Sequence, residues 1–122
     1  MEEPVGKTAL AAITLVDTAD EELPLVCDIG AIDAGNRANH LSLASHLLGE
    51  RALERRETVD GYTFTFRAED YARVAEFIAN ERLCCSFLHF NLDIPPGKGK
   101  LTLHIRGEEG ARAVLLAELN LA

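Results

Sequence analysis

A hairpin signal near the middle of the chain constrains its fold most strongly. After Asp60-Gly61, the apolar side chains Tyr62, Phe64 and Phe66 alternate with polar residues, which is the pattern of a strand with one buried face. Asp60-Gly61 is typical of a two-residue type I′ turn, because glycine tolerates a positive φ. With the run that precedes the turn as its partner strand, the pattern predicts a hairpin over residues 53–67.

This hairpin places charged side chains opposite its aromatic face. With the turn at Asp60-Gly61, Glu57 faces Phe64 and Arg55 faces Phe66. One interpretation is an edge strand that carries inward-pointing charges against edge-to-edge pairing. The other is that Arg55 or Glu57 lines a pocket shared with polar residues of the helices.

Helical and strand-like patterns follow one another along the chain. The predicted elements are a strand over residues 23–29, a helix over 33–48, the hairpin, a helix over 69–85, strands over 88–94 and 101–105, and a helix over 108–119. We therefore predict an α+β two-layer sandwich, with a mostly antiparallel sheet, helices on one face and a helix–hairpin unit that occurs twice. Residues 23–122 are expected to form a single domain. Residues 1–22 precede it as an N-terminal segment and possible edge strand.

Composition restricts the class of partner. The chain has 122 residues and a formal net charge of −8, and an acidic surface repels nucleic-acid backbones. It has no apolar run of about 18 residues, so we expect no membrane span. The start of the chain lacks the basic residues of a signal peptide, which predicts a cytoplasmic protein with reduced cysteines.

Two polar residues fall on apolar helical faces. On a helical wheel, His40 lies at the centre of the apolar arc of its helix, with Arg37 at the border. Glu81 falls within the apolar arc of the next helix, where a carboxylate is costly unless it is paired. We predict that His40 and Glu81 lie close together and face the sheet. The alternative is a frayed helix end that leaves Glu81 at the rim.

The chain has three cysteines, two of them adjacent at the end of this helix. A Cys84–Cys85 disulfide is disfavoured, because neighbouring Cα atoms are about 3.8 Å apart, whereas disulfides prefer about 4.4–6.8 Å. We therefore predict three free thiols. Cys85 is most simply a small core residue, and Cys84 is the better candidate for reactivity. Cys27 approaches the pair only if its strand lies centrally.

The segment Glu81-Arg82-Leu83-Cys84-Cys85-Ser86-Phe87 resembles a motif of small uncharacterised bacterial proteins, E-R-x-C-C-P-F, with Ser86 in place of proline. The resemblance spans roughly residues 25–120. It also includes Arg37-x-x-His40, Asp60-Gly61-Tyr62 with Phe64 and Phe66, and Gly107-Glu108-Glu109-Gly110. It implies a site at Arg37, His40, Glu81, Arg82, Cys84 and Cys85, but it implies no activity.

These observations lead to two hypotheses. In the first, a polar pocket binds a small ligand or a soft metal ion. Its ligand-binding residues would be Arg37, His40, Glu81 and Arg82, and its metal ligands would be Cys84, Cys85 and His40. Catalysis by an acid/base pair is left open. In the second hypothesis, the chain is a non-catalytic interaction module, for example a homodimer, and its cysteines are structural.

Overall fold

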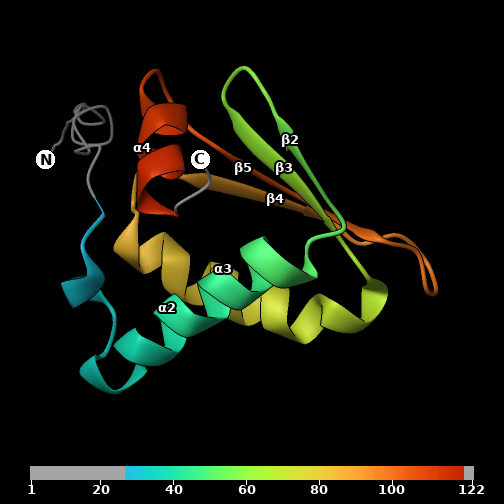
Figure 1. Cartoon of the computed structure of the whole chain (residues 1–122), viewed down its shortest axis with the longest axis horizontal. Helices are drawn as coiled ribbons and strands as arrows, with labels where there is room; N and C mark the ends of the chain where they lie inside the picture. Colours follow the sequence, from blue (N-terminus) through green and yellow to red (C-terminus); the bar gives the residue numbers. More distant parts are fainter. Residues whose placement is uncertain (1–26, 120–122) are drawn as a thin grey trace, which may run out of the picture.

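The chain folds into an antiparallel sheet with helices packed against it (Figure 1). This computed structural model describes residues 27–119. The principal elements are α2 (Arg37–His46), β2 (Glu54–Glu57), β3 (Gly61–Phe66), α3 (Tyr71–Cys84), β4 (His89–Asp93), β5 (Leu101–Arg106) and α4 (Ala111–Glu118). The predicted α+β class is confirmed. The edge strand suggested for residues 1–22 and most of the strand expected over 23–29 lie outside the described residues.

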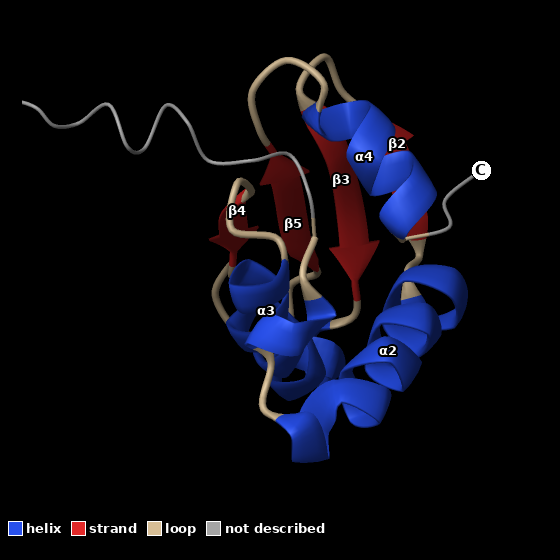
Figure 2. Ribbon diagram, turned by 90° about the vertical axis from the view of Figure 1, so that its left-hand side faces the viewer, coloured by secondary structure: helices blue, strands red, loops and turns tan. Residues whose placement is uncertain are grey.

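The sheet has the strand order β2-β3-β5-β4, and every neighbouring pair is antiparallel. Figure 2 shows α2, α3 and α4 on the viewer's side of the sheet. Alternate residues of the two central strands are buried, as expected for a sheet with one covered face. These residues are Tyr62, Phe64 and Phe66 on β3 and Leu101, Leu103 and Ile105 on β5. They form the centre of the core beneath the helices.

The segment before α2 is irregular where a strand and a longer helix were predicted. Ile29 begins a short 3-10 turn, so the described end of the predicted strand over 23–29 is not a strand. Asp33 does act as a cap, but for a second 3-10 turn, through a 3.3 Å hydrogen bond from the backbone N–H of Gly35. α2 then continues into a π-helical turn, Leu47–Arg51, so Gly49 does not end the helix.

α3 begins after a buried acidic residue. Asp70 has no exposed side-chain surface, and it forms ion pairs of 3.2 Å with both Arg51 and Arg73. Paired in this way, a buried carboxylate is tolerated. The helix buries four residues along one face: Val74, Phe77, Glu81 and Cys84. None of the helices in the described part of the chain is long and apolar enough to cross a membrane.

The hairpin forms where predicted, but its register and its turn differ from the prediction. Glu57 pairs with Tyr62 and Arg55 pairs with Phe64, so each residue pairs two positions earlier on β3 than predicted. Gly61 does not have a positive φ, so the predicted type I′ turn is wrong. Gly61 is the first residue of β3, and a Cβ atom there would clash with the carbonyl oxygen of Ile105. The glycine thus permits a close approach of two backbones. The shift of two positions preserves which side chains share a face.

Candidate functional site

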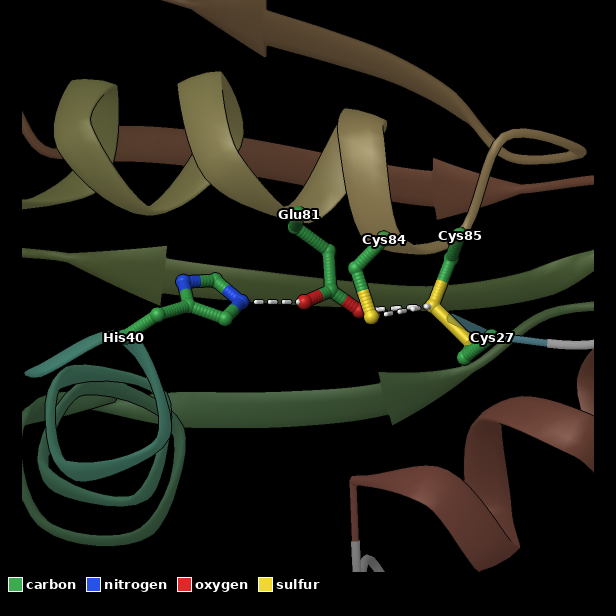
Figure 3. The surroundings of a disulfide bond; sticks show 5 residues. All are labelled: Cys27, His40, Glu81, Cys84 and Cys85. Atoms are coloured by element: carbon green, nitrogen blue, oxygen red, sulfur yellow. Dashed lines mark hydrogen bonds and ion pairs between the residues drawn. A yellow bond between two sulfur atoms is a disulfide. The ribbon is translucent and has the colours of Figure 1, made fainter. Parts of the chain in front are cut away.

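The candidate site lies where the last turns of α3 meet the first turn of α2. Glu81 and Cys84 lie on the buried face of α3, and His40 lies on the buried face of α2. Figure 3 shows the side chains of His40 and Glu81 pointing toward one another, with three sulfur atoms beyond the carboxylate. Helical periodicity places the imidazole of His40, the carboxylate of Glu81 and the sulfur of Cys84 in one region of the interior, and two further sulfurs lie beside them.

His40 and Glu81 form a buried pair. Nε2 of His40 lies 2.7 Å from Oε1 of Glu81, and the two residues are 3% and 2% exposed. The imidazole also stacks on Phe77, with ring centroids 5.7 Å apart. The predicted proximity of His40 and Glu81 is confirmed, and the alternative of Glu81 at the rim is wrong.

The surroundings of Nδ1, the second ring nitrogen of His40, determine which of the two ring nitrogens carries the imidazole proton. Nδ1 is buried and has no hydrogen-bond partner within residues 27–119. A proton on Nδ1 would be an unsatisfied buried donor, which costs more than an unused acceptor lone pair. We therefore assign the neutral tautomer in which Nε2–H donates to the Glu81 carboxylate. Burial raises the pKa of the Glu81 carboxyl, while the hydrogen bond from His40 opposes this rise.

Cys27 and Cys85 form a disulfide, which contradicts the prediction of three free thiols. The two residues are separated by 58 positions in the sequence, and their Cα atoms lie 4.3 Å apart. The prediction was wrong because it rested on the expected cellular compartment and left Cys27 unplaced. Cys84 and Cys85 do not pair with each other, in agreement with the argument from their adjacent Cα atoms.

The three sulfur atoms form one cluster beside the His40–Glu81 pair. The Sγ atoms of Cys27, Cys84 and Cys85 all lie within 4.8 Å of one another. Oε2 of Glu81 lies 3.2 Å from Sγ of Cys85, a contact that is not a hydrogen bond while Cys85 carries no thiol proton. The metal ligands predicted from the sequence were Cys84, Cys85 and His40. In the structure Cys27 joins the two other sulfurs, whereas His40 is hydrogen-bonded to Glu81.

Cys84 is the free thiol of the cluster. It is 4% exposed, and burial together with the nearby negative charges of Glu81 and Glu118 raises its pKa to about 11. The nucleophilic form of cysteine is the thiolate. Because Cys84 is almost entirely protonated at neutral pH, it is a poor nucleophile.

We expect Cys84 in the native protein to react slowly with maleimides at pH 8. Relative to an ordinary thiol, a pKa of about 11 reduces the thiolate population roughly two-hundredfold, and burial slows reaction further. Mass spectrometry of the oxidised protein, with and without denaturant, measures the rate at Cys84. Labelling that is equally fast under both conditions would contradict the assignment of a buried, protonated thiol.

A surface pocket of about 360 Å³ lies next to the His40–Glu81 pair. His40, Glu81 and Cys84 contribute to its lining, together with Arg55 of β2 and Glu118 of α4. The suggestion that Arg55 or Glu57 shares a pocket with His40 and Glu81 is therefore confirmed for Arg55. Glu57 instead forms an ion pair of 3.2 Å with Arg112.

No protein-family model, curated protein or solved structure matches this chain.

The two arginines of the predicted ligand site lie away from this pocket. Nε of Arg37 donates to the carbonyl oxygen of Ile32 at 2.9 Å, and Nη2 donates to that of Gly30 at 3.1 Å. Arg37 thus holds the loop before α2 in place. Arg82 is exposed on α3 and does not line the pocket. Of the four predicted ligand-binding residues, His40 and Glu81 come together, while Arg37 and Arg82 do not join them.

Sequence reasoning allowed Cys27 to approach the pair only from a central strand, which is wrong because Cys27 lies in no strand, and it missed Glu118. Cys27 precedes a 3-10 turn, and the backbone N–H of Asp28 donates to the carbonyl oxygen of Cys84 at 2.7 Å, which brings Cys27 to the end of α3. Glu118 reaches the pocket from the last turn of α4. Cys27 lies outside any helix or strand, so periodicity gave no signal for it. No local pattern marked Glu118, because its position depends on how α4 packs against the sheet.

Proposed function

We propose that the reduced protein binds a soft metal ion through the sulfur atoms of Cys27, Cys84 and Cys85. The observation that carries this proposal is the distance of at most 4.8 Å between these three atoms. Thiolates are the preferred protein ligands of soft ions such as copper(I) and of zinc. Reduction of the Cys27–Cys85 disulfide is required first, because a disulfide sulfur is not a thiolate.

The neighbouring polar pair supports this proposal. Zinc sites usually have four ligands, and the Glu81 carboxylate, 3.2 Å from Sγ of Cys85, is close enough to supply the fourth. His40 would then orient that carboxylate through its 2.7 Å hydrogen bond, as residues around a metal site commonly orient its ligands. The binding of a positive ion would also favour the thiolate form of Cys84 over its protonated form.

The expected result is one ion per reduced chain and no comparable binding to the oxidised chain. Titration of the reduced protein with zinc or copper(I), in competition with a coloured chelator, measures the affinity. Cys84→Ser should weaken binding by at least about tenfold, and His40→Ala by about 10–100-fold. Binding should also weaken below about pH 6, as the ligands become protonated.

His89→Ala is the matched control, because His89 is an exposed histidine at the start of β4. This variant should bind the ion as the wild type does. If the reduced wild type binds no more tightly than a double variant, Cys84→Ser with His40→Ala, the metal proposal is wrong.

The pocket supports a second candidate function, the binding of a small polar ligand. Arg55 and Glu118 offer opposite charges on the lining of the same 360 Å³ pocket as His40 and Glu81. A thermal-shift screen of small anionic, cationic and zwitterionic compounds tests this, with Arg55→Ala as the comparison. A compound that raises the Tm of the wild type but not the Tm of Arg55→Ala would support ligand binding in this pocket. A screen that finds no such compound would count against this function. The interaction-module hypothesis and the homodimer stay predictions.

A further inference from the structure

The two residues of the Cys27–Cys85 disulfide are unequally exposed to the surroundings. Cys27 is partly exposed, whereas Cys85 has no exposed surface and Cys84 is 4% exposed. An incoming thiolate needs direct access to the sulfur that it attacks. Of the three cysteines, Cys27 is therefore the one that an external thiol can reach while the protein stays folded.

We propose that the Cys27–Cys85 bond is a reversible redox centre that exchanges with low-molecular-weight thiols through the sulfur of Cys27. This activity does not depend on metal binding, although it would convert the sulfur cluster into the form that the proposed metal site requires. Its substrate class is a small thiol in the reducing direction and the corresponding small disulfide in the oxidising direction.

The exchange proceeds in two steps. The thiolate of the external thiol attacks Sγ of Cys27, so a mixed disulfide forms there while the Cys27–Cys85 bond breaks. Cys85 leaves with the electron pair of that bond and takes up the proton that the external thiol released. A second external thiolate then attacks the external sulfur of the mixed disulfide. Cys27 leaves as a thiolate and is protonated in turn, so that two small thiols are oxidised to one small disulfide and two cysteines are reduced.

The structure also favours the return of the bond. The 2.7 Å hydrogen bond from the N–H of Asp28 to the carbonyl of Cys84 joins the backbone beside Cys27 to the backbone beside Cys85. This contact does not involve the sulfurs, so it remains available after reduction and keeps the two thiols near each other. Such proximity makes the attack of Cys85 on a mixed disulfide at Cys27 an intramolecular step with a high effective concentration.

Glutathione is a suitable probe, used with a metal chelator so that no ion occupies the cluster. The folded wild-type protein is mixed with reduced glutathione, quenched with acid, alkylated in denaturant and digested for mass spectrometry. The expected intermediate carries glutathione on Cys27 and the alkyl group on Cys85. Glutathione on Cys85 or Cys84, or the absence of any exchange in the folded protein, would overturn the proposal. This measurement requires no substitution, so it does not depend on the folding of a variant.

Two variants examine the roles of the two sulfurs separately. With oxidised glutathione, Cys85→Ser should accumulate the mixed disulfide on Cys27, because the thiol that resolves it is missing. Cys27→Ser should form an adduct at least about tenfold more slowly, since its remaining thiols are buried. Ser86→Ala, at the exposed neighbouring position, should behave as the wild type. A Cys27–Cys84 disulfide in Cys85→Ser, or rapid adduct formation in Cys27→Ser, would contradict the assignment.

The result can be separated from that of the metal proposal. If the reduced protein binds no ion but exchanges at Cys27, the metal proposal fails and the redox centre stands. If it binds an ion but its disulfide does not exchange in the folded state, the redox centre fails and the metal site stands.

Discussion

Replacing Cys27 by serine is expected to lower the free energy of unfolding by about 4 kcal/mol. The disulfide joins residues 58 positions apart, and closing a loop of this length removes conformational entropy from the unfolded chain. The loop contains α2, the β2–β3 hairpin and α3, so the constraint covers more than half of the described residues. Loss of the bond should therefore destabilise the whole fold and not one loop.

Denaturant unfolding with and without a phosphine reductant measures this effect. The reductant should lower the unfolding midpoint of the wild type to near that of Cys27→Ser, and it should not change the midpoint of the variant. Ser86→Ala should respond to the reductant as the wild type does, because it keeps the disulfide. A wild-type midpoint that is the same under both conditions would show that the bond does not contribute to stability.

Replacing Glu81 by alanine is expected to lower the free energy of unfolding by about 1–3 kcal/mol. The substitution removes the hydrogen-bond partner of His40 Nε2, and Nδ1 already has no partner within residues 27–119. Only the Nε2–H donor becomes newly unsatisfied, and leaving a buried donor without a partner costs about 1–3 kcal/mol. The relief of burying one fewer carboxylate offsets part of this cost.

Chemical denaturation of Glu81→Ala, His40→Leu and the double variant separates these contributions. The double variant should lose less free energy of unfolding than the two single variants lose in sum. The expected difference, the coupling energy, is about 1–3 kcal/mol. Glu76→Ala is the matched control, an exposed carboxylate on the same helix, and it should change stability by less than about 0.5 kcal/mol. Additive effects at His40 and Glu81 would mean that their 2.7 Å contact does not stabilise the fold.

Two predictions that used side-chain periodicity were accurate. The helical wheel identified His40 and Glu81 as inward-facing, and the structure buries both in direct contact. The alternation of Tyr62, Phe64 and Phe66 identified the buried face of β3. In both cases the sequence spacing determines the direction of a side chain, since a helix repeats every 3.6 residues and a strand every two.

Predictions that needed a register or a distant partner were less accurate. The hairpin pairs Glu57 with Tyr62. The backbone at Gly61 packs closely against Ile105 of β5, a contact between segments more than 40 positions apart. Arg37 lies at the border of the apolar arc on the helical wheel, next to His40. Its guanidinium nevertheless binds backbone carbonyls of the preceding loop. A wheel shows the direction of a side chain, but it does not show what the side chain meets.

The amino-acid sequence by itself determined the α+β class, the buried faces of the two central strands, and the inward direction of His40 and Glu81. These properties follow from local periodicity, which acts over a few residues. Only the tertiary structure decided that Cys27 joins Cys85, that Cys84 remains a buried thiol, and that Arg55 and Glu118 share a pocket with the His40–Glu81 pair. These contacts depend on how separate segments pack in three dimensions, and no local pattern encodes the distance between residues 58 positions apart.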